Sequence, residues 1–422
     1  MLLEFACSNH KSIKDKVVFS ALAGKDNTFE NELIKFGSFR VLENAVIYGA
    51  NGSGKSNLID AVSFMKNLVL NSINLQPGQG ILQQPHKMLD ISTDSSYSIQ
   101  FITKGVRYAY GFSINKSLVR EEYLYYFPNC RQVKVFERQN NDFTAGDKFR
   151  GKFDTCKDVL KPNRLLLSCA ANFSSVECIA NAFSFFRDDL IIYKGFGTDN
   201  WMDYSLHKIH DDPHSKKIVL SLLNNLGTGI KDILITIDKK NMTASEMPPF
   251  LSDEFKALIA KQQIDAINAK VVYDQFTVDL FTEESTGIKK LFEFLCPMID
   301  IIINGKVLIC DEIETSFHES IICGLVGLFK SLCLDPPAQM FFTTHDTSIL
   351  SLSLFRRDQI WFTELTKDCR ATDLYSLAEI KNVRKDENVG RGYISGKYGA
   401  VPMLNDNLAD VIAKMQGADN NG

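Results

Sequence analysis

The chain has 422 residues, of which 45% are hydrophobic and 23% are charged, the composition of an ordinary globular protein. Its 47 basic and 51 acidic residues give a net charge of −4, which excludes a chain-wide electrostatic attraction to nucleic acid. We expect a cytoplasmic protein without a membrane span, because no apolar stretch is long enough and the 10 cysteines are scattered without a CxxC pair.

Short β-rich segments fill the first third of the chain. Two of them lie near the N-terminus, at 2–7 and 16–22. Four more follow at 97–102, 106–114, 118–127 and 132–137. Turn residues such as Lys104-Gly105 separate the last four, so they are predicted to form an antiparallel meander.

The segment 49–56 reads GANGSGKS and matches the phosphate-binding loop (P-loop) pattern. The apolar run 44–48 predicts a buried strand before it, and apolar residues at helical spacing in 58–69 predict a helix after it. A glycine-rich turn with an incidental lysine is the alternative that this context disfavours. Loop N–H groups, the Lys55 ammonium and the Ser56 hydroxyl are expected to bind a nucleoside triphosphate with Mg²⁺. The predicted contacts are Gly49, Asn51, Gly52, Ser53, Gly54, Lys55, Ser56 and Asn57.

A second segment, KVLICDEIETSFH at 306–318, has the arrangement of a Walker B strand. The apolar residues 307–310 predict a buried strand that leads directly into Asp311 and Glu312. Asp311 is expected to hold Mg²⁺, and Glu312 to polarise the attacking water as general base. A strand that ends in a solvated acidic turn is the alternative.

Another apolar strand, 340–342, is predicted shortly before His345. In a chain with a P-loop and a Walker B strand, a histidine at the end of an adjacent strand is placed to contact the γ-phosphate. Read alone, His345 would more often be a surface or loop histidine.

The segment EESTGIKKLFEFL, 283–295, predicts an amphipathic helix that begins near Ser285. Ser285 and Gly287 would then offer a hydroxyl and backbone N–H groups to an anion at the positive end of the helix dipole. A plain N-cap by Ser285 or Thr286 is the other interpretation, and both can hold together.

The middle of the chain, 140–270, is predicted to be a mainly helical insertion, and no heptad repeat persists long enough for a coiled coil. Within it, HKIHDDPH at 207–214 is interpreted as a solvated turn at Pro213, with a metal site as the alternative. Near the C-terminus, 384–398 is basic and tyrosine-containing, so a partner or nucleic-acid surface and a solvated segment stay equally open. The polar end, 417–422, is expected to be frayed.

The order of these motifs resembles the ABC-type ATPase head of the SMC/Rad group, and the opening segment 1–24 resembles the N-terminal strands of its smaller bacterial members. Further matches at 105–124, 311–320 and 391–402 resemble the AAA-type "ATP/GTP phosphatase" proteins related to the OLD ATPases and to the RloA and AbiLi defence proteins. The PARIS and Septu anti-phage ATPases are more distant comparisons.

The resemblance implies an α/β P-loop NTPase fold: an ABC/SMC-like head with an antiparallel β-lobe and a helical insertion. We predict an ATPase lobe at 1–139, the insertion at 140–270 and a second ATPase lobe at 271–422. In relatives the segment from Asn9 to Ser12 approaches the nucleotide. Neither Gln83 nor Gln84 is clearly the metal-linked glutamine of the family, so that role stays open.

The same resemblance implies an ATP hydrolase that works as a homodimer of heads, with assembly into a larger oligomer left open. Ser285 and Gly287 would act in trans, on ATP and Mg²⁺ held by the P-loop of a second subunit. Our leading hypothesis is a nucleotide-driven sensor or scaffold subunit of an anti-phage or toxin-control system. It would hold a separately encoded effector such as a nuclease, through which nucleic acid could be contacted. A DNA-repair ATPase that clamps DNA, and a scaffold that holds ATP without turnover, are the alternatives.

Overall fold

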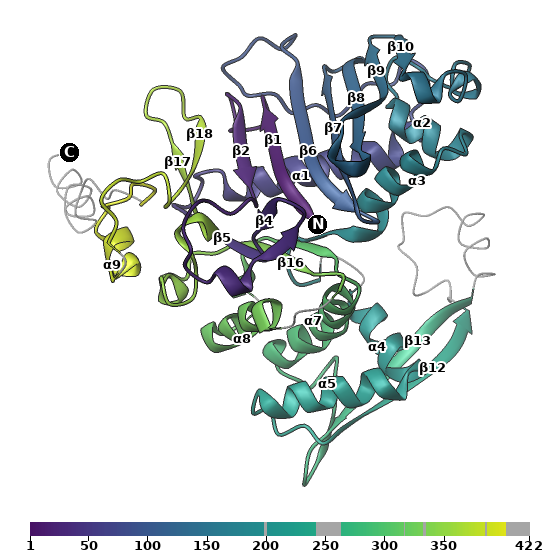
Figure 1. Cartoon of the computed structure of the whole chain (residues 1–422). Coiled ribbons are helices and arrows are strands. Elements are labelled where there is room, and N and C mark those ends of the chain that lie inside the picture. The colour runs from purple at the N-terminus through teal and green to yellow at the C-terminus, as the bar shows by residue number, and fades with distance from the viewer. Residues whose placement is uncertain (198–200, 242–262, 316, 332–334, 385, 402–422) are drawn as a thin grey trace, which may run out of the picture. The chain divides into compact units, whose positions relative to one another are not determined.

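The computed structural model describes residues 1–197, 201–241, 263–315, 317–331, 335–384 and 386–401. The chain divides into two compact units, one made of Met1–Leu190 with Phe341–Gly422 and the other of Ile191–Met340. Both units contain strands and helices (Figure 1). The polar end that was expected to fray, 417–422, lies outside the described residues.

The first unit contains a seven-stranded antiparallel sheet in the order β10-β9-β8-β7-β6-β1-β2. Its strands are β1 (Leu2–Ser8), β2 (Val17–Ser20), β6 (Ser95–Thr103), β7 (Val106–Ile114), β8 (Val119–Phe127), β9 (Val133–Gln139) and β10 (Asp142–Ala145). Lys104 and Gly105 join β6 to β7 with positive φ angles of 48° and 71°, as tight hairpin turns require. The predicted meander is confirmed.

Helices cover one face of this sheet. Side chains alternate between the faces of a strand, and on β6 the side chains of Ile99 and Phe101 are buried. Phe101 stacks on Phe185, with the ring centroids 4.1 Å apart. Phe185 begins a short π-helical turn after α3 (Glu177–Ser184), and α3 packs against α2 (Leu166–Phe173). Aromatic packing therefore joins the sheet to its helical layer.

A buried ion pair ties α2 to the sheet. Glu122 on β8 and Arg138 on β9 lie 3.4 Å apart, and both side chains are 0% exposed. Glu122 also accepts hydrogen bonds from the backbone N–H groups of Leu166 and Leu167, at 2.6 and 2.9 Å. Burial raises the pKa of Glu122, and the Arg138 charge and these N–H groups oppose that shift.

We expect Arg138→Leu to lower the free energy of unfolding by about 3–5 kcal/mol, because it leaves a buried carboxylate without its counter-charge. Urea unfolding at neutral pH measures the loss. Arg120→Leu is the matched control, since Arg120 lies on the neighbouring β8 but pairs with Asp94 at 3.6 Å while 47% exposed. The control should cost at most about 1 kcal/mol. Equal losses in the two variants would contradict this account of the buried pair.

In the first unit, β5 (Asn44–Gly49) lies between two neighbouring strands, and all six of its residues are buried. It pairs in parallel with β17 (Ile360–Leu365), which pairs antiparallel with β18 (Thr372–Ser376). On its other side β5 neighbours β16 (Gln339–Thr343). The predicted helix after β5 is α1 (Lys55–Asn71), and it buries Leu58, Ile59, Val62, Met65 and Val69 as expected. A small hairpin, β3 (Ile34–Phe36) and β4 (Phe39–Val41), and the short α9 (Val389–Ile394) complete the unit.

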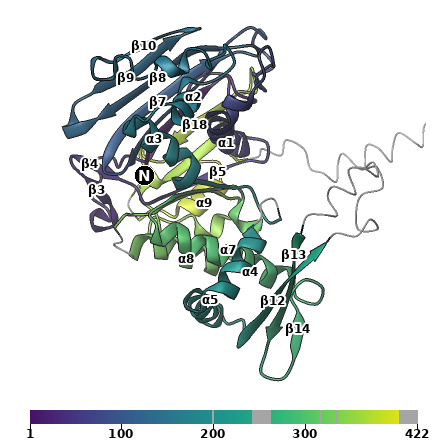
Figure 2. The same ribbon diagram turned by 90° about the vertical axis from the view of Figure 1, so that its right-hand side faces the viewer.

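The second unit contains β11 (Leu190–Tyr193) beside β15 (Val307–Cys310), together with four helices in its described residues. The helices are α4 (Trp201–Asp211), α5 (Pro213–Asn225), α7 (Thr286–Ile303) and α8 (Glu319–Ser331). A separate sheet has the order β12 (Asp232–Asn241), β13 (Gln263–Val272) and β14 (Thr277–Asp279). Figure 2 shows α4 and α5 beside this sheet, and α4 also packs on α7.

The range 140–270 differs from its predicted mainly helical make-up. It contains α2 to α5, but also β10, β11, β12 and most of β13 among its described residues. In β13 the buried Ala269 and Val271 alternate with the exposed Asn268 and Lys270, which is the period of a strand and not of a helix. The compact units also divide near residues 190 and 340, not at the predicted 139/140 and 270/271 boundaries.

The histidine cluster at 207–214 is helical, not a free turn. His207 and His210 lie on α4, and Asp212 caps α5 by accepting from His214 N at 2.9 Å. His207 Nε2 lies 3.0 Å from Asp265 Oδ2. Among the described residues no group of three His, Cys, Asp or Glu side chains could hold a metal. The described helices also include none long and apolar enough to cross a bilayer.

Candidate nucleotide-binding site

The P-loop connects the buried end of β5 to the first residue of α1. Gly49 is the last residue of β5, and α1 begins at Lys55 with Gly54 as its N-cap. Ser53 N donates to Ala50 O at 3.1 Å, which closes the turn. The predicted strand, loop and helix are therefore present in the order that a phosphate site requires.

Two threonines from distant strands hold the loop in place. Ser53 Oγ lies 2.6 Å from Thr363 Oγ1 on β17. Thr372 Oγ1 on β18 donates to Ser53 O at 2.9 Å. Sequence reasoning missed both residues, because they follow the P-loop by more than 300 positions and belong to no recognisable motif.

Gly54 cannot carry a side chain in this arrangement. Its φ is 109°, and an added Cβ would lie 2.0 Å from Thr372 Oγ1. We expect Gly54→Ala to weaken nucleotide binding about tenfold or more, because the loop must shift away from β18. Gly78→Ala, outside the P-loop, is the matched control: its φ is 79°, and an added Cβ would meet nothing within 4 Å. Binding of a fluorescent ATP analogue measures both, and an unchanged affinity in Gly54→Ala would contradict the prediction.

Lys55 is almost fully buried at the base of the loop. It is 4% exposed, and its Nζ donates to Gly49 O at 2.8 Å and to Ala50 O at 3.3 Å. These two carbonyl oxygens satisfy part of the donor capacity of the ammonium group and hold its charge against the loop backbone. The side chain is therefore fixed where the P-loop pattern expects a phosphate-binding cation.

The start of α1 has the donor chemistry that fits a triphosphate with Mg²⁺. Gly54 provides no side-chain cap, so the first-turn N–H groups of this 17-residue helix stay directed at the loop. Asn51, Gly52 and Ser56 are exposed, and Asn57 is partly exposed. The exposed Ser56 hydroxyl is a hard oxygen ligand of the kind that Mg²⁺ prefers.

The turn between β1 and β2 reaches α1 through three side chains, and the first of them, His10, places its Nε2 3.1 Å from Asp60 Oδ2. Ser12 Oγ accepts from Asn57 Nδ2 at 2.6 Å and lies 2.7 Å from Thr372 Oγ1. Lys11 Nζ forms an ion pair with Asp60 at 2.6 Å. Asn9, in contrast, is 2% exposed and bonds to backbone groups of the 86–94 region. Of the segment expected near the nucleotide, His10, Lys11 and Ser12 thus contact the P-loop helix.

His345 lies in the turn that follows β16, near the end of β5 from which the P-loop departs. The preceding Thr344 donates its N–H to Ile47 O on β5 at 3.2 Å. The following Asp346 accepts from Tyr48 Oη at 2.8 Å through its backbone carbonyl. The His345 side chain itself is exposed. The first unit therefore brings the predicted histidine and the P-loop to the same end of β5.

The predicted Walker B acids belong to the second unit, at the end of the fully buried β15. Asp311 N donates to Tyr193 O on β11 at 2.9 Å. Glu312 has a φ of 45°, and its carbonyl accepts from Thr315 N and Oγ1 at 3.0 and 2.8 Å. A positive φ is uncommon for a residue with a side chain, and such strain concentrates at functional sites. Both carboxylates are partly exposed.

Ser285 and Gly287 lie at the start of α7, also in the second unit. Ser285 is the N-cap, and its Oγ accepts from Ile288 N at 3.3 Å. Both residues are exposed, and an added Cβ on Gly287 would meet nothing within 4 Å. The N-cap interpretation is confirmed, and the same corner remains open to a ligand.

Gln83 and Gln84 have different surroundings. Gln83 is 6% exposed, and its Nε2 donates to Thr93 O at 3.0 Å and to Ser95 Oγ at 2.9 Å. Gln84 is exposed, and its backbone carbonyl accepts from Lys11 N at 2.7 Å. The Gln83 side chain therefore holds its loop against Thr93 and Ser95.

Residues 45–157 match the family model described as "AAA domain, putative AbiEii toxin, Type IV TA system". This range begins on β5 and includes the P-loop, α1 and the strands β6 to β10. A comparison with curated proteins gave no match.

Solved structures that resemble the chain are heads of SMC proteins. The SMC head domain from Thermotoga maritima has a TM-score of 0.40 at 10% identity, over 89% of this chain and 98% of that one. An SMC head bound to the C-terminal domain of ScpA, from Pyrococcus furiosus, has a TM-score of 0.41 at 11% identity, over 89% and 96%. These scores are low, so the fold assignment depends on the strand, loop and helix order described above. Residues 45–157 therefore match an AAA-domain family model and contain the buried strand, the loop and the helix of a P-loop.

Proposed function

We propose that this protein binds and hydrolyses ATP with Mg²⁺ at the P-loop. The observation that carries the proposal is the loop itself: a buried strand, an N-terminal helix end without a side-chain cap, and a buried lysine at its base. Such a set of N–H donors and one fixed cation binds the phosphates of a nucleotide. Adenine is proposed as the base from the family of the matching segment.

The proposed roles follow from the chemistry of each side chain. Mg²⁺, when bound, would neutralise phosphate charge and order the γ-phosphate for attack. Ser56 and Asp311 are its proposed protein ligands, since hydroxyl and carboxylate oxygens are the ligands it prefers. Glu312 would take a proton from the attacking water, and His345 would donate a hydrogen bond to the γ-phosphate.

We propose further that the active site is shared between two copies of the chain. Ser285 and Gly287 are exposed at the start of an 18-residue helix, where a hydroxyl and backbone N–H groups face solvent. An anion held by a second subunit could approach this corner without displacing any side chain. Hydrolysis would then open the pair, because loss of the γ-phosphate removes contacts from both subunits.

At the level of biology, we propose a nucleotide-driven sensor or scaffold subunit that controls a separately encoded effector in an anti-phage or toxin-control system. The description of the matching family, a putative toxin domain of a type IV toxin–antitoxin system, supports this role. The net charge of −4 provides no chain-wide attraction to nucleic acid. We therefore propose that any contact with nucleic acid is made through a partner.

The test is co-purification from the native host with the neighbouring genes intact. The Glu312→Gln protein is weighed by native mass spectrometry with and without ATP, beside the wild-type protein. A small protein that is retained or released according to nucleotide would support the effector-control role. Bound DNA without a protein partner would overturn that role in favour of a DNA clamp, and would leave the proposed ATPase chemistry intact.

A further inference from the structure

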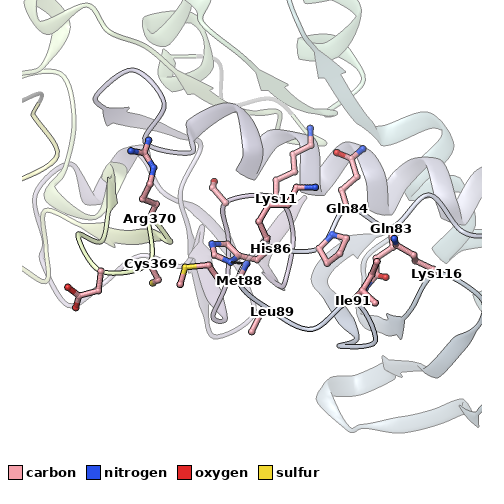
Figure 3. A pocket seen from close by; sticks show the side chains of 14 residues that line it. Lys11, Gln83, Gln84, His86, Met88, Leu89, Ile91, Lys116, Cys369 and Arg370 are labelled. Carbon is pink, nitrogen blue, oxygen red and sulfur yellow. Dashed lines mark hydrogen bonds between the residues drawn. The ribbon is translucent and has the colours of Figure 1, made fainter.

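A cavity of about 870 Å³ lies in the first unit, and no P-loop residue lines it. None of Gly49–Ser56 is among its 14 lining residues, which come from the turn after β1, the loop 83–91, Lys116 and the β17–β18 turn. In the view of Figure 3, Arg370 and Cys369 stand at one side of this group and Lys116 and Ile91 at the other. We call it the 83–91 cavity.

The lining of the cavity is strongly cationic. Lys11, Lys87, Lys116 and Arg370 line it, against the single carboxylate of Asp368. Lys11 is paired with Asp60. Within the described residues, the other three cations have no carboxylate within ion-pair distance. A concave site with an excess of positive charge favours an anionic ligand, and phosphate is the anion for which lysine and arginine are best suited.

The loop wall adds apolar surface and one unsatisfied acceptor. Met88 and Ile91 are each 62% exposed, an unusual degree for large apolar side chains on one short loop. Gln83 lines the cavity at 6% exposure, and its Oε1 has no hydrogen-bond partner. Its Nε2 is held by Thr93 O and Ser95 Oγ, which fixes the orientation of the amide. Its Oε1 is shielded from solvent, so Gln83 forms a fixed part of the wall.

Cations and exposed apolar side chains on one wall together match the phosphate and the base of a nucleotide. The phosphate would contact Lys87, Lys116 or Arg370, and the base would lie on Met88 and Ile91. A volume of this size accommodates such a ligand. We propose that the 83–91 cavity is a second, regulatory site for a nucleotide phosphate, separate from the nucleotide that the P-loop binds.

Two residues that line the cavity also contact α1, the helix that follows the P-loop. Lys11 and Ser12 line it, and they also bond to Asp60 and Asn57 on α1, both at 2.6 Å. Ser12 further contacts Thr372, which holds Ser53 O in the P-loop. An anion that draws Lys11 away from Asp60 changes the support of α1, so occupancy of the cavity should alter ATP turnover. The cavity would then sense a nucleotide, either free or within a nucleic-acid strand.

Cys369 provides a direct readout of occupancy. It lines the cavity, and a hydrogen bond from Thr366 lowers the pKa of its thiol, which favours the reactive thiolate. Cys130 is exposed, does not line the cavity and serves as the internal control. Alkylation by iodoacetamide is mapped at both cysteines by mass spectrometry. The Lys55→Ala protein is used, with its fold checked by circular dichroism, so that binding at the P-loop does not contribute.

Two probes distinguish the sources of the ligand: AMP as a free nucleotide and a short oligodeoxyadenylate as a single strand. We expect one of them to slow alkylation of Cys369 about tenfold at saturation, with Cys130 unchanged. Protection by AMP indicates a free nucleotide, and protection by the strand alone indicates nucleic acid; either supports the site. Lys116→Ala with Arg370→Ala should weaken the protecting probe about tenfold or more, whereas Lys148→Ala with Arg131→Ala, cations outside the lining, should not.

Two results would overturn the proposal. One is alkylation of Cys369 at an unchanged rate with both probes at millimolar concentration. The other is protection that occurs in the wild-type protein but not in Lys55→Ala, because the ligand would then be the P-loop nucleotide itself. Failure of the proposed ATPase function gives a different pattern, in which Cys369 is protected but ATP is never turned over.

Discussion

Lys55→Ala is expected to abolish ATP binding and hydrolysis, with an affinity loss of about a hundredfold or more. Lys55 is buried, and two loop carbonyls position its ammonium group at the base of the P-loop. Its removal takes away the one cation that the loop places against the phosphates, where a charge-assisted contact in a partly desolvated site is worth several kcal/mol. Equilibrium binding of a fluorescent ATP analogue, together with phosphate release, measures the loss.

Lys66→Ala is the matched control for this experiment. Lys66 also lies on α1, and its Nζ donates to Leu190 O at 2.6 Å, away from the loop. The control should bind ATP as the wild-type protein does, with a small loss of stability. ATP binding in Lys55→Ala within threefold of the wild-type affinity would contradict the role that we give to the P-loop.

Glu312→Gln is expected to lower the rate of ATP hydrolysis about a hundredfold or more and to leave ATP binding intact. Glutamine keeps the size and the backbone contacts of the side chain but cannot accept a proton from water, and general-base catalysis contributes about 10²–10⁴ in rate. The ATP-bound pair of heads should then accumulate, because the step that opens it is blocked. Single-turnover hydrolysis and native mass spectrometry measure the two effects.

Glu319→Gln serves as the control, since Glu319 is exposed in the first turn of α8 and is also in the second unit. It should hydrolyse ATP at the wild-type rate. Full turnover by Glu312→Gln would instead favour the alternative in which the protein holds ATP as a scaffold.

Local patterns in the sequence were sufficient to predict the central elements of the first unit. The apolar run before the P-loop became β5, the helical spacing after it became α1, and the alternating segments became β6 to β9. Each of these elements has a strong period and clear turn or loop residues at its ends, so few neighbours are needed to determine it.

Long-range contacts could not be predicted in the same way. Thr363 and Thr372 hold the P-loop from strands far along the chain, and nothing around them marks that role. The 83–91 cavity likewise combines residues from four separate segments. The long strands β12 and β13 were missed because a short apolar run, such as ILITI in β12, fits a buried helical segment as well as a strand.

The most direct test of the central claim is a mixing experiment between two variants. Lys55→Ala lacks a working P-loop but keeps the corner at Ser285 and Gly287, and Gly287→Glu has the opposite defect. An added side chain at Gly287 meets nothing within 4 Å, so the fold should be preserved, while the carboxylate repels phosphate. If ATP is hydrolysed between two subunits, each variant alone is inactive and an equimolar mixture recovers about a quarter of the wild-type rate. A mixture that stays inactive, or Gly287→Glu protein that hydrolyses ATP by itself, would contradict the account.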